Sequence, residues 1–377
     1  MPGNEIIGKE ELNNIKEIFT KSDGVLFAHA FDKRRKNIFR IRKFENKLSK
    51  YFSVKYVQCV SSGTAAIKIA LKSLGVKHGD EVITQSFNFI ATIEAILDIG
   101  AIPVITNIDE TLNMCCEDLK KKITKKTKAV LPVHMLGFPA EIKRIKKICK
   151  KKNIPVLEDN CESVGAKINK KYLGTFGDVG VFSFDFGKNI TTGEGGAILT
   201  NNKKLFKYCK EYHDHGHELN PKYPRGLDTV KIFGFNYRMT EMQGAVGLAQ
   251  LKKLKQILRL NKIRYKLLEG IIARKFKIRY KLKITEPSYD TFMFEIKNKN
   301  KRIKILEFLK KKGIGTKNVP DAIKWHFASF WKHALKKKEI NSIKKSREKI
   351  LNYLAIPILI KKPLKTYRDI ANFIYNL

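Results

Sequence analysis

The sequence predicts an α/β protein in which a mainly parallel central sheet is flanked by helices. Two observations favour this fold class. Short apolar runs alternate with helical patterns from about residue 50 to residue 200, and such alternation is typical of βαβ units with parallel strands. Near residue 250 the pattern changes to long, lysine-rich helices. We therefore expect a large domain over residues 1–250 and a smaller C-terminal α/β domain over residues 251–377, with residues 1–20 able to pack on the smaller one.

The first expected helix, 64–75, carries apolar residues on one face. Ile67, Ala70, Leu71 and Leu74 recur at the i, i+3, i+4, i+7 spacing. Short apolar runs are the expected strands, and they lie at 81–84, 129–133, 154–157, 180–184 and 197–200. Further helices are expected at 140–151, 240–255, 248–270, 301–313 and 335–352. Ligands of parallel sheets bind beyond the carboxyl ends of the strands, so the residues that follow these strands are the candidates for chemistry.

The net charge of +40 is the unusual bulk property of the chain. Residues 251–377 hold 35 Lys and Arg against 9 Asp and Glu, which supplies +26 of this total. In some proteins a surplus of this size reflects nucleic-acid binding. Here the basic residues are mostly lysines scattered along amphipathic helices, and no zinc-finger, homeodomain or RNP pattern accompanies them. We therefore expect no nucleic-acid partner and a positive field that attracts anionic small substrates.

The N-terminal sequence and the cysteines indicate a cytoplasmic location. The first residues lack the basic and apolar regions of a secretory signal, and no run approaches the ~18 apolar residues of a membrane span. The six cysteines form no CxxC pair, which is typical of reduced thiols in a cytosolic protein. The segment 213–217 (HDHGH) could bind a metal, because alternate residues of an extended segment share a face. We expect substrate or loop-shaping contacts there and no metal.

Four junctions carry residues that suit chemistry. Ser61-Ser62-Gly63-Thr64 opens a helix, where backbone N–H groups beside hydroxyls can bind one phosphate, although an ordinary N-cap explains the same pattern. Asp159 follows the strand 154–157, where a carboxylate can cap a neighbour or hold a ring nitrogen protonated. Lys188 lies between a buried strand and the glycine-rich run 191–196, and a pocket that lowers its pKa would make it a nucleophile. The fourth junction is the polar-aromatic loop 234–239.

These motifs resemble those of the DegT/DnrJ/EryC1/StrS family of sugar aminotransferases. The resemblance runs over nearly the whole chain and is carried by the ordered set SSGTAA, QSFNFIAT, LEDN, FSF…K, TTGEGGA and GFNYRMTEMQGA. It implies the type I, aspartate-aminotransferase-like fold, pyridoxal 5'-phosphate as the cofactor, and a homodimer with shared active sites.

The resemblance also implies roles for single residues. Lys188 matches the lysine that bonds to the cofactor, Asp159 the acid that pairs with the pyridine nitrogen, and Phe89 the aromatic residue that stacks on the ring. The further cofactor contacts match Gly63, Thr64, Glu162, Ser183 and Asn236, the last of which reaches the cofactor phosphate of the neighbouring subunit. Substrate contacts are expected from His215, Tyr237, Arg238 and His326.

Two residues depart from the family pattern. Where many members have Gln or His three residues after the aspartate, this chain has Glu162. Where many have His three residues before the lysine, it has Asp185. Both departures add negative charge near the cofactor ring and bear on how the substrate is handled.

The function implied is transfer of an amino group from L-glutamate to a keto-sugar of surface-polysaccharide or lipopolysaccharide biosynthesis. The usual acceptor of the family is a nucleotide-linked 4-keto-6-deoxyhexose. Residues 214–218, 224–226 and 320–327 are similar to members that aminate C8 of an oxidised 3-deoxy-manno-octulosonate, the 8-amino-3,8-dideoxy-manno-octulosonate branch. A keto-sugar 3-dehydratase and a non-catalytic regulatory protein remain alternatives. The family's dehydratases have His where this chain has Lys188, which favours amination.

Overall fold

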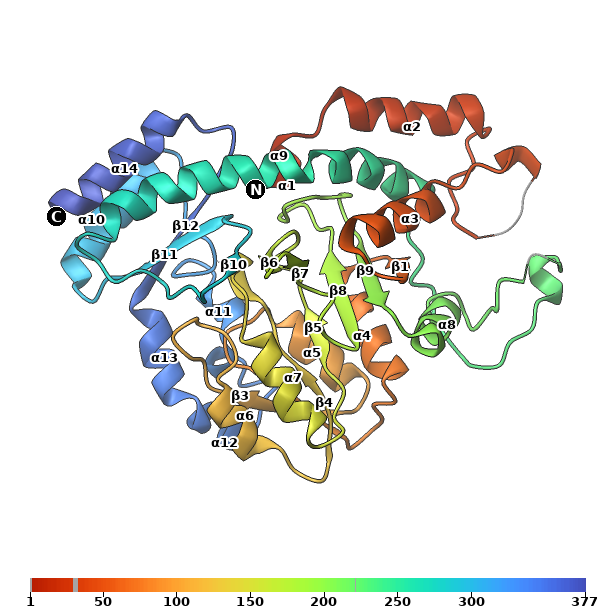
Figure 1. The fold of residues 1–377 in the computed structure, drawn as a ribbon, viewed down its shortest axis with the longest axis horizontal. Coiled ribbons are helices and arrows are strands. Elements are labelled where there is room, and N and C mark those ends of the chain that lie inside the picture. The colour runs from red at the N-terminus through yellow and green to blue at the C-terminus, as the bar shows by residue number, and fades with distance from the viewer. Residues whose placement is uncertain (1, 30–32, 221) are drawn as a thin grey trace.

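The computed structural model describes residues 2–29, 33–220 and 222–377 (Figure 1). Its central sheet has two hydrogen-bonded parts, β3-β2-β4 and β1-β9-β8-β5. Parallel bridges from Val130 to Val156 and from Val133 to Asp159 join them, so the order across the sheet is β3-β2-β4-β5-β8-β9-β1. Every pairing is parallel except those of β9. The predicted mainly parallel sheet is therefore confirmed. The strands are β1 (Tyr56–Val60), β2 (Glu81–Gln85), β3 (Ile102–Thr106), β4 (Thr127–Leu131), β5 (Leu157–Asp159), β8 (Val179–Ser183) and β9 (Gly196–Thr200).

The reversal of direction at β9 places the segment 184–195, which contains Lys188, at the carboxyl end of β8. Asp159 is the last residue of β5, the parallel neighbour of β8. The strand expected at 154–157 is placed too early in the sequence, since β5 begins at Leu157. Pro155 has no N–H to donate to the hydrogen-bond ladder of a sheet. Since β5 and β8 end at the same edge of the sheet, Asp159 and Lys188 lie at that edge together.

Helices cover both faces of this sheet. Val82 of β2 packs in a cluster with α4 (Gly63–Ser73) and α5 (Ala91–Asp98). Its neighbour Ile83 packs in a different cluster, with α6 (Cys116–Lys122) and α7 (Ile142–Lys150). Successive side chains of a strand point to opposite faces, so these two clusters are the two hydrophobic layers of the large part of the molecule.

The helix α9 (Glu241–Ile272) is longer than the sequence patterns predict. It is one continuous helix of 32 residues, and it includes both helices expected at 240–255 and 248–270. It begins at a capping box in which the hydroxyl of Thr240 accepts from the Gln243 N–H. In Figure 1 it runs across the molecule from the N-terminal helices to the C-terminal ones. Residue 250 lies inside this helix. The predicted division of the chain into two domains at residue 250 stays a prediction.

The N-terminal segment packs on α9. It contains α1 (Pro2–Glu5), α2 (Lys9–Lys21) and, beyond a short 3-10 turn, α3 (Arg40–Phe52). The Asn14 amide donates to the Ala245 carbonyl oxygen at 2.9 Å, and Lys253 pairs with Glu11 at 2.8 Å. One contact with the C-terminal part comes from Glu5, which accepts from the Lys361 N–H at 2.8 Å.

The C-terminal part surrounds a two-stranded antiparallel sheet, β11 (Thr291–Glu295) and β12 (Tyr353–Pro357). It also contains α10 (Lys299–Lys311), α11 (Ile323–His326) and α14 (Leu364–Asn376). The single helix expected at 335–352 is wrong. Two helices, α12 (Lys337–Ser342) and α13 (Lys344–Leu351), occur instead. The chain leaves helical geometry at Ile343, whose side chain is fully buried in the core.

The remaining elements are short. They are α8 (Lys203–Tyr212), β6 (Lys167–Ile168), β7 (Lys171–Tyr172), β10 (Thr285–Glu286) and the 3-10 turns Lys33–Arg35, Met135–Gly137, Arg225–Leu227 and Ala328–Phe330. Among the residues that the structure describes, no helix combines the length and apolar character that crossing a bilayer requires.

Candidate active site

A cavity of about 480 Å³ lies at the carboxyl edge of the sheet. Residues from the large part and from the C-terminal part line it together. It collects eight of the residues named from the sequence: Gly63, Thr64, Phe89, Asp159, Glu162, Ser183, Lys188 and His326. The wall also contains residues that the sequence patterns did not single out, among them Thr92, Lys317 and Asn318.

Lys188 is held by a carboxylate. Its Nζ donates to Glu162 Oε1 at 2.7 Å, and both side chains are largely buried. Burial lowers the pKa of Lys188, but the negative charge of Glu162 outweighs it and leaves that pKa above its ordinary value. A pocket that lowered the pKa of Lys188 would favour its role as a nucleophile, whereas in the cofactor-free protein the pKa of this amine is raised. The reason is Glu162, the residue that departs from the family pattern.

Glu162 also faces a second lysine. Its Oε2 atom is buried without a hydrogen-bond partner, 3.8 Å from Lys317 Nζ. Lys317 in turn pairs with Asp290 at 2.6 Å. Burial raises the pKa of Glu162, yet Lys188 and Lys317 bring it well below the usual range of a glutamate. Glu162 is therefore an ionised carboxylate that lies between the two lysine side chains.

Asp159 closes another side of the cavity. It is 3% exposed, its Oδ1 accepts from the Cys161 N–H at 3.0 Å, and its Oδ2 accepts from the Thr92 hydroxyl at 3.3 Å. Burial raises the pKa of this carboxyl above its ordinary value. A buried carboxylate with so few donors attracts a protonated nitrogen, because burying its charge without a cation is costly.

The start of α4 and the end of β8 form a narrow cradle. A Cβ atom on Gly63 would lie 2.9 Å from the Ser183 Cβ, so only glycine allows the two segments to approach this closely. Ser62 caps the helix by accepting from the Ala65 N–H at 3.0 Å. The first N–H groups of a helix have no backbone partner within the helix, and Gly63 and Thr64, the first two residues of α4, line the cavity together with Ser183.

These groups fit pyridoxal phosphate. The cradle suits its phosphate, and the buried Asp159 suits its protonated ring nitrogen. The unpaired Oε2 of Glu162 suits its ring hydroxyl. Phe89 leaves 43% of its surface uncovered in the cavity, where a flat ring can stack on it. Lys188 supplies the amine that such a cofactor requires.

The residues that the C-terminal part adds to the cavity wall were difficult to predict from the sequence. Lys317 is one of many lysines in a basic segment, and its only distinguishing features are tertiary, namely its burial and its two carboxylate neighbours. Thr92 could have been found, because it belongs to the QSFNFIAT motif, three residues after Phe89. His326 packs against Phe89 with the ring centroids 5.2 Å apart, and burial lowers its pKa.

The other predicted contacts lie outside this cavity, on the segment 213–238. Asn236 and His215 are exposed, and Asn236 forms an antiparallel bridge with Asp214. The Tyr237 hydroxyl accepts from Lys68 Nζ at 3.0 Å. Figure 1 shows the chain after α8 extending outward from the body of the molecule, beyond the sheet. Within one chain, therefore, these residues do not line the cavity that contains Lys188.

Asp214 connects the described residues on the two sides of position 221, namely 213–220 and 222–238. This carboxylate is 1% exposed and accepts from both Arg225 and Arg238, each through an Nη1 atom at 2.6 Å. Burial raises the pKa of Asp214, but the two arginines bring it below its usual range. His217 faces Asp228, with 3.6 Å between Nδ1 and Oδ2. The described residues contain no group of three or more His, Cys, Asp or Glu side chains arranged for a metal ion.

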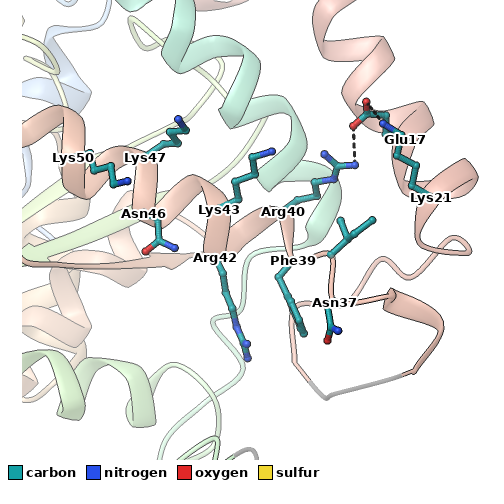
Figure 2. A pocket seen from close by; sticks show the side chains of 11 residues that line it. Glu17, Lys21, Asn37, Phe39, Arg40, Arg42, Lys43, Asn46, Lys47 and Lys50 are labelled. Carbon is teal, nitrogen blue, oxygen red and sulfur yellow. Dashed lines mark hydrogen bonds and ion pairs between the residues drawn. The ribbon is translucent and has the colours of Figure 1, made fainter.

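A second hollow, of about 620 Å³, lies beside α3 and is lined mainly by basic side chains. Figure 2 shows Lys43, Lys47 and Lys50 on α3, with Glu17 bridging Lys21 and Arg40. Among its lining residues Glu17 supplies the one carboxylate. The expectation that the chain has no nucleic-acid partner stays a prediction.

Comparisons with known proteins agree with this geometry. The chain is 42% identical over 214 residues to GDP-perosamine synthase of Escherichia coli O157:H7, a match that covers 56% of this chain and 57% of that protein. The chain thus spans little more than half the length of that curated relative. The structure of PseC of Helicobacter pylori, an aminotransferase of pseudaminic acid biosynthesis, superimposes with a TM-score of 0.83 at 25% identity, covering 100% of this chain and 98% of that one.

A third relative bears on the cofactor. A GDP-4-keto-6-deoxymannose-3-dehydratase with a trapped PLP-glutamate geminal diamine superimposes with a TM-score of 0.84 at 25% identity, over 99% of both chains. The full-length agreement with PseC confirms the expected type I fold. The sequence pattern of one family matches residues 34–371, from before α3 into α14, and the chain belongs to that family, the DegT/DnrJ/EryC1/StrS aminotransferases.

Proposed function

We propose that this protein is a pyridoxal-phosphate-dependent aminotransferase that moves an amino group from L-glutamate to a keto-sugar. The observation that carries the proposal is that Lys188 and a buried acid, Asp159, line the same cavity. This is the donor set that the cofactor needs, an amine for its carbonyl carbon and a carboxylate for its ring nitrogen.

When bound, the cofactor supplies an electron sink for the carbanion that forms beside the transferred nitrogen. Lys188 Nζ would take the proton from the carbon that bears the amino group of the donor, and in the second half of the cycle it would deliver a proton to the carbonyl carbon of the acceptor. Asp159 would keep a proton on the ring nitrogen of the bound cofactor. Glu162 would balance the positive charge at Lys188 Nζ, and Phe89 would cover one face of the ring.

The acceptor that we favour is a nucleotide-linked 4-keto-6-deoxyhexose. The similarity to GDP-perosamine synthases from Escherichia coli O157:H7 and Vibrio cholerae supports it, at 42% and 37% identity. An 8-oxo-3-deoxy-manno-octulosonate is the second candidate. Its support is the local similarity over 214–218, 224–226 and 320–327, the last of which includes the cavity residue His326.

We further propose a homodimer in which each subunit completes the other's active site. Asn236 is matched to a contact with the neighbouring cofactor phosphate, and it lies outside the cavity of its own chain. Its segment also exposes apolar side chains, with Leu227 and Phe233 leaving 71% and 70% of their surface uncovered. Exposed apolar patches are typical of interfaces.

Dehydration is the competing activity. A GDP-4-keto-6-deoxy-D-mannose 3-dehydratase of Yersinia pseudotuberculosis is 37% identical over 233 residues, 57% of this chain and 59% of that protein. Lys188 favours amination, because a lysine amine can leave and rejoin the cofactor carbonyl in each cycle.

Two measurements test the proposal. Protein purified with the cofactor should be yellow, and glutamate should bleach it while 2-oxoglutarate appears. With GDP-4-keto-6-deoxymannose, mass spectrometry should find a product that has gained nitrogen. A product that has lost water without gaining nitrogen would establish dehydration, and a protein that binds no cofactor would indicate a non-catalytic role.

A further inference from the structure

Four ionisable side chains of alternating charge lie in a row that leads from the cavity into the protein. In order they are Lys188, Glu162, Lys317 and Asp290, and the successive distances between nitrogen and oxygen atoms are 2.7, 3.8 and 2.6 Å. The first three line the cavity, and the last three are at most 9% exposed. Charges this far from solvent are costly unless each has a partner, so the members of this charge row depend on one another.

The charge row joins the two parts of the molecule. Lys188 and Glu162 follow the strands β8 and β5 of the large part, whereas Asp290 and Lys317 belong to the C-terminal part. The backbone of Lys317 is fixed to β12, because its N–H donates to the Ala355 carbonyl at 3.0 Å. The second cation beside Glu162 is therefore supplied by the C-terminal part.

The distances within the charge row are uneven. Lys317 Nζ donates to Asp290 Oδ2 at 2.6 Å but stays 3.8 Å from Glu162 Oε2, and that oxygen accepts no hydrogen bond in the protein. The Ser288 hydroxyl donates to the other oxygen of Asp290 at 3.3 Å. Asp290 thus holds the ammonium group of Lys317 close to itself. Lys317 supplies positive charge to Glu162 and leaves its Oε2 atom open.

Lys317 acts on Glu162 more directly than on Lys188. Burial raises the pKa of Glu162, and Lys188 and then Lys317 lower it. Burial lowers the pKa of Lys188, and Glu162 is the largest influence that raises it. The other ionisable groups that act on or near this pair are His326, Cys161, Asp185 and Asp159. An effect of Lys317 on the reacting nitrogen therefore runs through Glu162.

We propose that Lys317 is a positioning residue, which together with Asp290 keeps Glu162 a carboxylate and limits how firmly Glu162 holds the proton on Lys188. A carboxylate that faces two cations attracts each against the repulsion of the other. In the proposed function, on which this inference rests, Lys188 must lose that proton before it can bond to the cofactor. Through Lys317, the C-terminal part would take part in setting the state of the amine.

The test compares two variants in the cofactor-free full-length chain, by the rate at which an acylating reagent modifies Lys188. Lys317→Met removes the second cation, so Glu162 should hold the proton of Lys188 more firmly and the rate should fall about 10-fold, or one pKa unit. Asp290→Asn releases Lys317 toward Glu162, so the rate should rise by a similar factor. Opposite signs identify a charge effect, because a loosened pocket would change both rates in the same direction.

A second ion pair of the C-terminal part supplies the matched controls. Lys312 and Asp369 are 2.8 Å apart and do not line the cavity, so Lys312→Met and Asp369→Asn should leave the rate at Lys188 unchanged. In every variant the rate should rise about 10-fold for each pH unit between about pH 8 and 10, as for an amine that is still mostly protonated.

A double variant covers the case in which Lys317→Met alone does not fold. Lys317→Met with Asp290→Asn removes both charges together, and Lys188 should still react more slowly than in the wild type. The reason is that the lost cation is the member of the pair that faces Glu162.

Rates at Lys188 that change in the same direction in the two single variants, or that do not change, would overturn the assignment. The capture of added pyridoxal phosphate, followed by absorbance, should be slower and faster in the same variants, and capture rates that do not follow the acylation rates would refute the positioning role. A wild-type protein that captures no pyridoxal phosphate would refute the proposed function. The acylation rates need no cofactor, so they would distinguish that failure from a failure of the charge row.

Discussion

At the residue scale, the ion pair between Lys188 and Glu162 sets the state of the amine before the cofactor arrives. The two groups are 2.7 Å apart, and the pKa of Lys188 is raised by this neighbour. An ammonium group is not a nucleophile, so the proton must leave before the nitrogen can bond to a carbonyl carbon. Glu162 is the nearest acceptor for that proton.

Replacing Glu162 by glutamine should therefore make Lys188 more reactive in the cofactor-free protein. Without the carboxylate, burial dominates and the pKa of Lys188 falls. Each unit of decrease gives about a 10-fold faster reaction with an acylating reagent at pH 8. Peptide mapping by mass spectrometry measures the rate at Lys188, and the exposed Lys332 serves as an internal control. An unchanged rate at Lys188 would show that Glu162 does not control its proton.

Asp159 is the second residue with a defined expectation. Asp159→Asn preserves the shape of the side chain, and we expect Tm to stay close to the wild-type value. Turnover should fall by about 100-fold or more, since a neutral amide does not hold a ring nitrogen protonated. Steady-state kinetics with glutamate measures the loss. Turnover within a few-fold of wild type would exclude Asp159 from this role.

At the scale of elements, the contact between α3 and β1 contains a titratable group. Glu45 of α3 accepts from the Cys59 N–H at 2.8 Å and from the Gln58 side chain at 3.1 Å. The Gln58 side chain also forms a hydrogen bond with His213 at the end of α8, with 3.2 Å between the two Nε2 atoms. Burial raises the pKa of Glu45 to about 7. The carboxyl is thus easier to protonate in the folded protein than in the unfolded chain.

This shift predicts a loss of stability as pH rises. A raised folded-state pKa gives a stabilisation that is fully present below the unfolded value, near 4.5, and is lost as pH rises through about 7. Between pH 5 and pH 8 the wild-type free energy of unfolding should fall by on the order of 2 kcal/mol from this group. Glu45→Gln should lack that part of the decrease. Denaturant titration at both pH values measures it, and parallel pH curves for the two proteins would contradict the assignment.

At the scale of the whole molecule, the segment 213–238 indicates how two chains would share their sites. Asp214 clamps it through two arginines, and it presents Asn236 away from the cavity of its own chain. A second copy is the partner that would bring Asn236 to a cofactor. An obligate interface of this kind buries more than ~2,000 Å² in total.

Mixing two inactive variants tests the shared site. Lys188→Ala and Asn236→Ala should each lose activity as homodimers. In a mixed dimer one site retains both wild-type residues, so unfolding and refolding the two together should restore about a quarter of the wild-type sites. Turnover of the mixture and its mass by light scattering are the measurements. No recovery from a mixture that is dimeric would refute the exchange of Asn236 between subunits.

The sequence by itself determined the fold class and the central chemistry. Apolar runs that are buried on both faces are typical of the central strands of an α/β sheet, and β2, β4, β8 and β9 lie within a few residues of their expected positions. Lys188 and Asp159 were found because each follows such a run, and Gly63 because it belongs to the small-residue turn that opens the helix expected at 64–75. The strands that precede these residues end at the same edge of the sheet, so the fold class alone places the three residues near one another.

Tertiary structure decided what the side chains do to one another. The pKa of Lys188 depends on Glu162, which lies 26 residues earlier in the chain, and the ionisation of Glu162 depends on Lys317 from the C-terminal part. Burial and charge act through space, so no local pattern contains them. The same holds for the pair of Lys317 and Asp290, which are 27 residues apart in the sequence and meet only in the folded chain.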